Sequence, residues 1–186
     1  MSTAKRRHRL PGDPSNEQMV ERMVRVDHAG EFGAVRIYEG QLAVLGKSKL
    51  APVIRHMLDQ EKEHLGRFDE MVADRRVRPT ALLPLWHLAG FALGAGTALL
   101  GEKAAMACTV AVEEVIDEHY AEQVEALDDE GVEDDLRKTF EKFRVEELEH
   151  RDTGLEHGAE QAPGYEVLSG AVKAGSRLAI WLSTRI

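Results

Sequence analysis

The apolar positions of the chain recur at the spacing of α-helices, with turn-forming sequences between the segments that carry them. In the first such segment an apolar side chain returns about every 3.6 residues. Gly46-Lys47-Ser48 and Asp128-Asp129-Glu130-Gly131 are turn-like, and each is expected to join two antiparallel helices. The pattern thus predicts an all-α four-helix bundle whose long helices cover residues 16–45, 50–77, 102–127 and 132–157.

A further segment, residues 165–186, is predicted to form a C-terminal amphipathic helix. Its polar residues are mostly basic, among them Lys173, Arg177 and Arg185, in a chain whose net charge is -9. Such a helix either packs against the bundle or lies in a membrane interface. The sequence leaves both interpretations open.

Length and composition favour one domain. With 186 residues, of which 43% are hydrophobic, the chain can bury a core, and we expect the domain to span residues 19–186. Residues 1–18 lack the apolar stretch of a secretory signal and are predicted to be a disordered arm. The pI near 5.4 argues against a nucleic-acid-binding protein. Cys108 is the only cysteine, which excludes a disulfide framework and fits a reducing compartment.

A short motif is repeated in the second and fourth predicted helices. Glu61-Lys62-Glu63-His64 recurs as Glu147-Leu148-Glu149-His150. Helical residues three apart are separated by about 60° around the axis, so the Glu and the His of each copy share a face. A single Glu-x-x-His step is weak evidence for a metal site in a chain that is 31% charged, because an exposed polar helix face would also explain it. The second copy makes a metal site the leading hypothesis.

Each copy also has a carboxylate upstream in an apolar or small-residue run. Glu31 precedes Glu61 by 30 residues and Glu113 precedes Glu147 by 34, so the midpoints fall in the two predicted turns. The two glutamates of each pair would then lie at the same height on neighbouring helices. The pattern matches the ferritin-like carboxylate proteins that bind two metal ions. The predicted ligand set is Glu31, Glu61, His64, Glu113, Glu147 and His150.

Four carboxylates and two imidazoles are hard and borderline donors, which suit iron or manganese better than metals that prefer thiolates. We expect Glu61 and Glu147 to bridge two cations. Glu31 and Glu113 would be terminal ligands. Two ferrous ions with an open coordination position can reduce and activate O₂.

Residues near the terminal glutamates carry two further expectations. Asp27 and Asp117 each lie one helical turn from such a glutamate, and we expect them to orient the ligating histidines, the alternative being that they are solvated acids. Gly30 and Gly33 interrupt the first helix, at roughly 1 kcal/mol each relative to Ala. They either leave room for a ligand beside Glu31 or permit close helix packing.

Residues 80–101 contain no formally charged side chain over 22 residues, a length that would suffice for a membrane span. A single crossing would place Glu31 and Glu113 on opposite sides of the bilayer, which a shared metal site forbids. We therefore expect a long apolar crossover connection, partly buried and partly available to lipid or to an apolar ligand. Its breakers predict an irregular path: Pro84, Gly90, Gly94 and Gly96.

Several runs resemble the demethoxyubiquinone hydroxylase family of ubiquinone biosynthesis. The first of them reads Val26-Asp27-His28-Ala29-Gly30-Glu31. The likeness covers roughly residues 20–186, and the runs that carry it are residues 26–34, 60–64, 84–86, 90–101, 107–114 and 146–150.

The resemblance implies a di-iron monooxygenase that hydroxylates the ring of a demethoxyubiquinol, a polyprenyl benzoquinol, with O₂ in the penultimate step of ubiquinone biosynthesis. It implies two iron ions per chain and NADH as the reductant. No Gly-x-Gly-x-x-Gly turn follows a predicted strand, so a nucleotide-binding motif is not recognisable. Tyr120, on the face of Glu113, and its neighbour His119 are candidates for a relay of protons or electrons, or for substrate contact.

A polyprenyl substrate requires contact with a membrane without spanning it. We expect peripheral membrane association through residues 80–101 and the C-terminal helix, and self-association into a homo-oligomer. The resemblance adds a lipid-binding accessory protein as a candidate partner. The expected location is the cytoplasmic face of a prokaryotic cell membrane, or the mitochondrial inner membrane if the source is eukaryotic.

Other classes of protein share the predicted bundle. A ferritin-like iron-handling protein, either a ferroxidase or a store, would use similar ligands, but the uncharged connection argues against it. A di-iron peroxidase would bring a further electron-transfer iron site, which one cysteine cannot build. A di-iron quinol oxidase would remove electrons from a quinol without adding oxygen to it.

Overall fold

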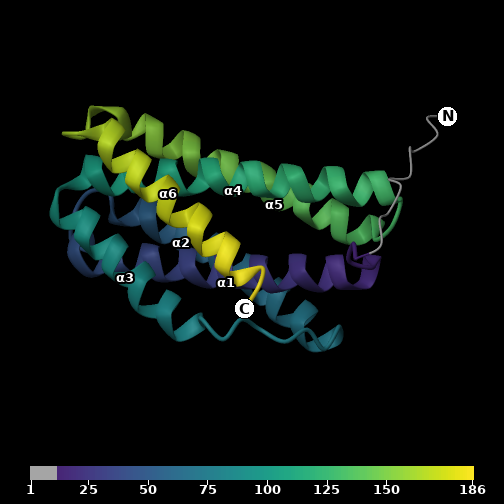
Figure 1. Ribbon diagram of the computed structural model, residues 1–186. Helices are drawn as coiled ribbons and strands as arrows, with labels where there is room; N and C mark the ends of the chain where they lie inside the picture. The colour runs from purple at the N-terminus through teal and green to yellow at the C-terminus, as the bar shows by residue number, and fades with distance from the viewer. Residues whose placement is uncertain (1–11) are drawn as a thin grey trace.

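The computed structural model describes residues 12–186, and in this part of the chain all regular secondary structure is helical (Figure 1). The all-α prediction is thereby confirmed. The elements are α1 (Asn16–Leu45), α2 (Ala51–Asp74), α3 (Leu83–Leu99), α4 (Glu102–Glu130), α5 (Asp134–Glu156), the short 3₁₀ helix η1 (Ala159–Gln161) and α6 (Tyr165–Ser183).

The ends of the helices follow local chemistry. Ser15 caps α1, because its side chain accepts a hydrogen bond from the Gln18 amide while the Gln18 side chain accepts one from the Ser15 amide. α4 ends at Gly131, which adopts the left-handed conformation at φ 64°. Of the arm predicted over residues 1–18, residues 1–11 lie outside the described part and residues 16–18 begin α1.

Two hairpins, α1 with α2 and α4 with α5, form the bundle (Figure 1). One apolar cluster packs around Tyr38, Ile54 and Met106, and another around Phe68 and Phe140. Polar side chains interrupt the core between the clusters. In α1, Glu31 falls between Val24 of the second cluster and Val35 of the first.

The irregular path predicted for the uncharged connection is wrong, since α3 is continuous from Leu83 to Leu99. Pro84 lies in the first turn, where its missing N–H leaves no hydrogen bond unmade. Gly90 and Gly94 instead permit a close approach to α1. A Cβ at Gly90 would lie 2.9 Å from the carbonyl oxygen of Gly33, and one at Gly94 would overlap the backbone of Ile37.

α6 crosses the bundle obliquely and packs on α4 (Figure 1). Lys173 Nζ lies 2.5 Å from Glu114 Oε2, and Arg177 lies 2.8 Å from Glu118 Oε2. Lys173 and Arg177 of α6 thus attach the helix to the bundle. Among residues 12–186, no helix is both long enough and apolar enough to traverse a bilayer.

The glycine contact between α1 and α3 generates a stability prediction. Gly94→Ala should lower the free energy of unfolding by about 1–3 kcal/mol or more, because the new methyl group has no space against α1. Urea unfolding followed by circular dichroism measures it.

Gly96→Ala is the matched control, because it lies in the same helix and its Cβ would meet no atom within 4 Å. This change should be neutral or stabilise by up to about 1 kcal/mol. Equal effects of the two substitutions would contradict the account.

Candidate metal centre

Six side chains converge between the two apolar clusters, one from each of α1 and α4 and two from each of α2 and α5. Each is at most 4% exposed. They form two groups in which the candidate ligand atoms lie within 4.8 Å of one another: Glu31, Glu61, His64 and Glu147, and Glu61, Glu113, Glu147 and His150.

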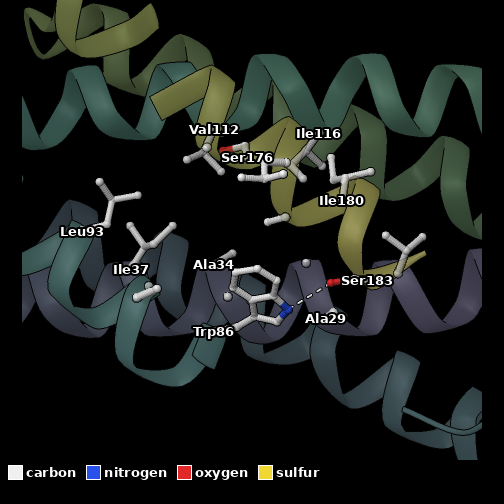
Figure 2. A pocket seen from close by; sticks show the side chains of 18 residues that line it. Ala29, Ala34, Ile37, Trp86, Leu93, Val112, Ile116, Ser176, Ile180 and Ser183 are labelled. Atoms are coloured by element: carbon white, nitrogen blue, oxygen red, sulfur yellow. Dashed lines mark hydrogen bonds between the residues drawn. The ribbon is translucent and has the colours of Figure 1, made fainter. Parts of the chain in front are cut away.

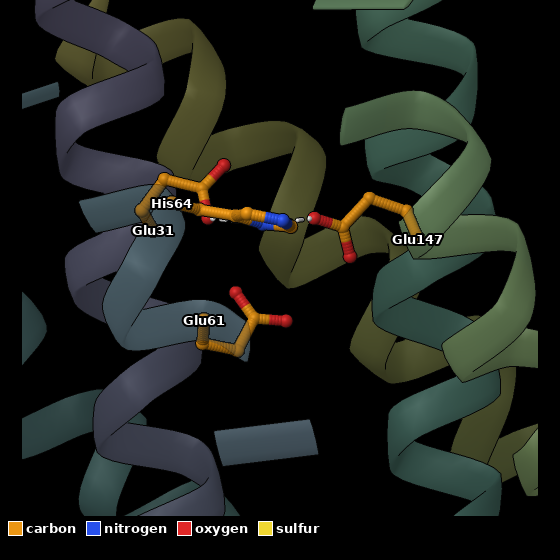
Figure 3. Close-up of side chains that lie close together, drawn as sticks. All are labelled: Glu31, Glu61, His64 and Glu147. Atoms are coloured by element: carbon orange, nitrogen blue, oxygen red, sulfur yellow. Dashed lines mark ion pairs between the residues drawn. The ribbon is translucent and has the colours of Figure 1, made fainter. Parts of the chain in front are cut away.

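The two groups share Glu61 and Glu147, and each has one further glutamate and one histidine of its own. Figure 3 shows the first group, with the His64 ring between the carboxylates of Glu31 and Glu147. The structure thus brings together all the residues that the sequence analysis selected as ligands. The sharing of two carboxylates is the arrangement expected of bridging ligands.

The imidazoles direct Nδ1 toward the carboxylates. His64 Nδ1 lies 3.1 Å from Glu147 Oε1 and 3.5 Å from Glu31 Oε2. His150 Nδ1 lies 3.1 Å from Glu61 Oε1 and 3.4 Å from Glu147 Oε2.

The opposite ring nitrogens have their own acceptors. His64 Nε2 lies 2.8 Å from Glu146 Oε2, and His150 Nε2 lies 3.1 Å from Gln60 Oε1. Because both oxygens are acceptors, they fix the proton on Nε2 and leave Nδ1 free to bind a cation.

The expectation that Asp27 and Asp117 orient these histidines is wrong. Asp27 pairs with His119 and Gln123, and Asp117 accepts a hydrogen bond from Arg144 at 2.6 Å. One turn along α1 or α4 from a terminal glutamate, neither aspartate reaches the imidazoles of the other two helices.

Two tyrosines donate hydrogen bonds to the two glutamates predicted to be terminal ligands, each from the opposite hairpin. Tyr120 on α4 donates a hydrogen bond to Glu31 on α1, and Tyr38 on α1 donates one of 2.8 Å to Glu113 on α4. Sequence reasoning missed Tyr38. The signal was present, because Tyr38 follows Glu31 by seven residues as Tyr120 follows Glu113.

The unpaired polar atoms of the centre test whether a cation fits. Glu31 Oε2, both oxygens of Glu61, Glu147 Oε2 and Nδ1 of each imidazole are buried without a hydrogen-bond partner. Buried polar atoms are normally satisfied. Here they are oxygen and nitrogen atoms that face one another and can each donate an electron pair to a metal ion. Iron and manganese prefer this set of ligand atoms.

The crowded carboxylates perturb one another. Burial raises the pKa of Glu61 and of Glu113 well above the usual value, and the charge of Glu147 raises it further. Burial would also raise the pKa of Glu147, but the imidazoles of His150 and His64 beside its oxygens lower it to about 2. Burial alone would lower the pKa of His64, whereas the nearby carboxylates of Glu147 and Glu31 raise it to about 12. The centre therefore requires positive charge, as protons or as cations.

The predicted relay residues lie at one side of the centre. The ring centroids of His119 and Tyr120 are 6.3 Å apart, and only Tyr120 contacts a predicted ligand. His119 Nε2 lies 2.9 Å from Asp27 Oδ1, and Gln123 donates to the same oxygen at 2.9 Å. Burial raises the pKa of Asp27 although the pairing with His119 opposes this.

An apolar cavity of about 400 Å³ lies between α1, α3, α4 and α6 (Figure 2). Trp86 of α3 donates a hydrogen bond of 3.0 Å from its indole Nε1 to Ser183 of α6. Gly30 and Gly33 line the cavity, and a Cβ on either would meet no atom within 4 Å. Of the two interpretations of these glycines, room for a ligand is thus the one the structure favours.

Comparison with known proteins adds a family. The family model described as ubiquinone biosynthesis protein COQ7 matches residues 18–183, which include all six residues of the centre. A relative from Rhodospirillum rubrum, named 3-demethoxyubiquinol 3-hydroxylase, is 64% identical over 179 residues, covering 96% of this chain and 84% of the relative.

Two eukaryotic relatives are also similar over most of their length. The human protein named NADPH-dependent 3-demethoxyubiquinone 3-hydroxylase, mitochondrial, is 56% identical over 176 residues, covering 94% of this chain and 81% of the relative. The Saccharomyces cerevisiae protein named 5-demethoxyubiquinone hydroxylase, mitochondrial, is 42% identical over 182 residues, covering 90% and 78%.

The raised pKa of Glu113 predicts how pH affects the metal-free protein. An acid whose pKa is higher in the folded state supports stability below its unfolded pKa, near 4.5, and this support is lost as pH rises toward the folded pKa. Glu113→Gln should therefore gain stability over the wild type by up to about 1.4 kcal/mol per pH unit above pH 5. Thermal unfolding in a chelator between pH 5 and pH 8 measures the difference.

Glu149→Gln is the control, because Glu149 is exposed on α5. Its difference from the wild type should not change with pH. A Glu113→Gln difference that is equally flat would contradict the burial argument.

Proposed function

The chain belongs to the family of ubiquinone biosynthesis protein COQ7, and we propose that it is an O₂-dependent di-iron monooxygenase that hydroxylates the ring of a demethoxyubiquinol. The observation that carries the proposal is the pair of buried ligand groups that share Glu61 and Glu147. The names of the relatives supply the substrate, a demethoxyubiquinol or demethoxyubiquinone.

Two iron ions are the proposed cofactor. One would be held by Glu31 and His64 and the other by Glu113 and His150, with Glu61 and Glu147 shared, and the unpaired buried atoms of these residues support the assignment. Ferrous ions bound there would transfer electrons to O₂ and offer it open coordination positions.

The protein's own part is to hold these ligands and exclude water. Tyr38 and Tyr120 keep the terminal carboxylates in place from the opposite hairpin, and Gln60 and Glu146 keep the Nε2 proton of each imidazole. The flanking apolar clusters keep the centre dry, which strengthens each electrostatic contact within it.

The apolar cavity is the proposed site of the quinol. It lies against the outer faces of α1 and α4, the helices that carry Glu31 and Glu113, and its wall is almost wholly apolar, as a polyprenyl benzoquinol requires. Its volume, about 400 Å³, accommodates a substituted ring and the first part of a prenyl chain.

His119 and Tyr120 are the proposed relay between quinol and iron. Ile116 lines the cavity, and His119 follows it by one turn of α4. From there the Asp27-bound imidazole of His119 would give a proton to the Tyr120 hydroxyl as that hydroxyl passes its own proton to Glu31, to which it already donates.

The reductant is proposed to be a nicotinamide nucleotide. The human relative is named NADPH-dependent, whereas the resemblance implies NADH, so NADH stays a prediction. The described residues contain no β-strand, and thus no strand-turn-helix dinucleotide motif. Two electrons from the nucleotide and two protons would balance the reduction of the second oxygen atom of O₂ to water.

The competing functions predict different products. An iron store or ferroxidase would consume O₂ without needing a quinol, and a quinol oxidase would return an unoxygenated quinone. The apolar cavity beside the centre favours a substrate larger than a metal ion. The fate of the oxygen atom separates the three.

We propose peripheral attachment to a membrane through the outer faces of α3 and α6. Large apolar side chains are exposed there, and the two helices also wall the cavity: Leu85, Leu88, Leu99, Val167, Leu178 and Trp181. Trp86 of α3 lines the cavity. The eukaryotic relatives are named mitochondrial, whereas the cytoplasmic face of a prokaryotic membrane, a homo-oligomer and a lipid-binding accessory protein stay predictions.

Product analysis tests the function. Protein loaded anaerobically with ferrous iron, then given short-chain demethoxyubiquinol, NAD(P)H and ¹⁸O₂, should incorporate one ¹⁸O atom into the ring. Glu61→Ala and Glu147→Ala should lose both iron and product, because each removes a shared ligand.

Glu63→Gln and Glu149→Gln are controls on the exposed faces of the same helices and should retain both. Oxidised quinone without ¹⁸O would identify a quinol oxidase. Iron oxidation that is indifferent to quinol would identify an iron-handling protein.

Filling the cavity tests the substrate site. Gly30→Leu should reduce quinol turnover at least tenfold while iron content is unchanged, because its side chain would project into the cavity. Gly66→Leu is matched, since it also lies in mid-helix with no atom within 4 Å of its Cβ but is exposed on α2. Unaltered turnover in Gly30→Leu would remove the cavity as the substrate site.

Vesicle flotation tests the membrane proposal. Leu88 of α3 is 69% exposed, and Leu88→Glu should reduce flotation with lipid vesicles, because a carboxylate resists transfer from water. Val145 of α5 is 57% exposed, and Val145→Glu should float like the wild type. A loss of flotation in both variants, or in neither, would mean that α3 is not the attachment surface.

A further inference from the structure

The two imidazoles of the centre have different partners. The acceptor at His64 Nε2 is the carboxylate of Glu146, whereas the acceptor at His150 Nε2 is the amide oxygen of Gln60. Glu146 directly precedes Glu147, and Gln60 directly precedes Glu61. The two acceptors are thus equivalent positions of the repeated half, and each holds the histidine of the other hairpin.

The remainder of the centre is closely matched between halves. Both halves have a terminal glutamate that receives a tyrosine hydroxyl, a shared glutamate, and an imidazole with Nδ1 turned inward. Among the side chains that form hydrogen bonds with these six residues, the acceptor of the Nε2 proton is the one that carries a formal charge in one half and none in the other.

A charged acceptor changes the imidazole that donates to it. A carboxylate draws the Nε2 proton more strongly than an amide does, which makes Nδ1 a stronger donor to a cation. Glu146 is also anchored, because Lys142 Nζ lies 3.5 Å from its second oxygen, Oε1. In addition, the Phe143 ring stacks on His64 with centroids 4.0 Å apart, which restricts rotation of the imidazole.

We propose that Glu146 is a positioning residue that makes the half of the centre formed by Glu31 and His64 the tighter cation site, so that this half is filled first. Gln60 leaves the half formed by Glu113 and His150 the weaker. The proposal rests on the metal site proposed above. It assigns the inequality of the halves to one charged hydrogen bond, not to the ligands themselves.

Anaerobic calorimetric titration with Fe²⁺ tests the assignment. The wild type should bind two ions in unequal steps. Glu146→Gln should weaken the tighter step by about 10–100-fold and bring the two steps together, since loss of such an acceptor typically has this effect on metal affinity. Gln60→Glu should strengthen the weaker step, and ⁵⁷Fe Mössbauer spectra should show two signals in the wild type that converge in Glu146→Gln.

Single-site backgrounds identify the half concerned. His150→Ala should keep the tighter step, and adding Glu146→Gln should weaken that step by the same factor of about 10–100. His64→Ala should keep the weaker step and be insensitive to Glu146→Gln. The double variant Glu146→Gln/Gln60→Glu should again have two unequal steps with these dependences exchanged.

Controls separate the hydrogen bond from net charge and from folding. Glu149→Gln removes the same charge from an exposed position of α5 and should leave both steps unchanged. Circular dichroism checks that each variant is folded. Equal weakening of both steps by Glu146→Gln, or no weakening, would overturn the inference, whereas a wild type that binds no Fe²⁺ would overturn the metal site itself.

Discussion

The central constraint on this molecule is that four carboxylates and two imidazoles lie in the dry interior of a helical bundle. Buried charge without compensation is costly, so the surrounding structure is organised to hold that charge in one arrangement. Each of the four bundle helices supplies at least one candidate ligand. The two tyrosines bind across from one hairpin to the other, and so do the acceptors of the imidazole protons. The hairpins are thereby joined by polar contacts at the level where apolar packing is interrupted.

The sequence predicts the structure correctly where its residues follow a helical period or a repeated motif. The doubled Glu-x-x-His step, with a carboxylate upstream at nearly equal distance, predicts the six residues that the structure brings together. The apolar periodicity and the turn-like sequences predict the four long helices within a few residues of their observed ends. Features that depend on contact between helices could not be read in this way. The local sequence predicts breaks at the glycines of α3, because it carries no sign of the backbone contact with α1 that they permit. It likewise does not indicate that Gln60 and Glu146 orient the imidazoles, since the histidine that each contacts lies on the opposite hairpin.

The repeat is not a perfect one, and its departures gather around one half. Gln41 and Gln123 occupy equivalent positions of the two halves, and so do Thr109 and Asp27. Gln41 donates a hydrogen bond to Thr109, and Gln123 donates one to Asp27. Only the second pairing recruits a histidine, His119. The half that contains Glu31 thus has additional ionisable neighbours, while its counterpart has a hydroxyl and apolar side chains. The two halves of the repeated bundle thus differ in chemistry, because only one has an aspartate and a histidine beside its glutamate.

Two of the helices that line the cavity, α3 and α6, are attached to the bundle by different physical means. α3 is joined to α1 by backbone contact at glycines, which dissolved salt does not weaken. α6 is joined to α4 in part by the partly exposed pairs of Lys173 with Glu114 and Arg177 with Glu118, which mobile ions screen. An anionic surface would compete with Glu114 and Glu118 for the same two cations. The attachment of α3 to the bundle is therefore independent of salt, whereas the attachment of α6 depends on the ionic surroundings. The hydrogen bond from Trp86 to Ser183 connects the two helices.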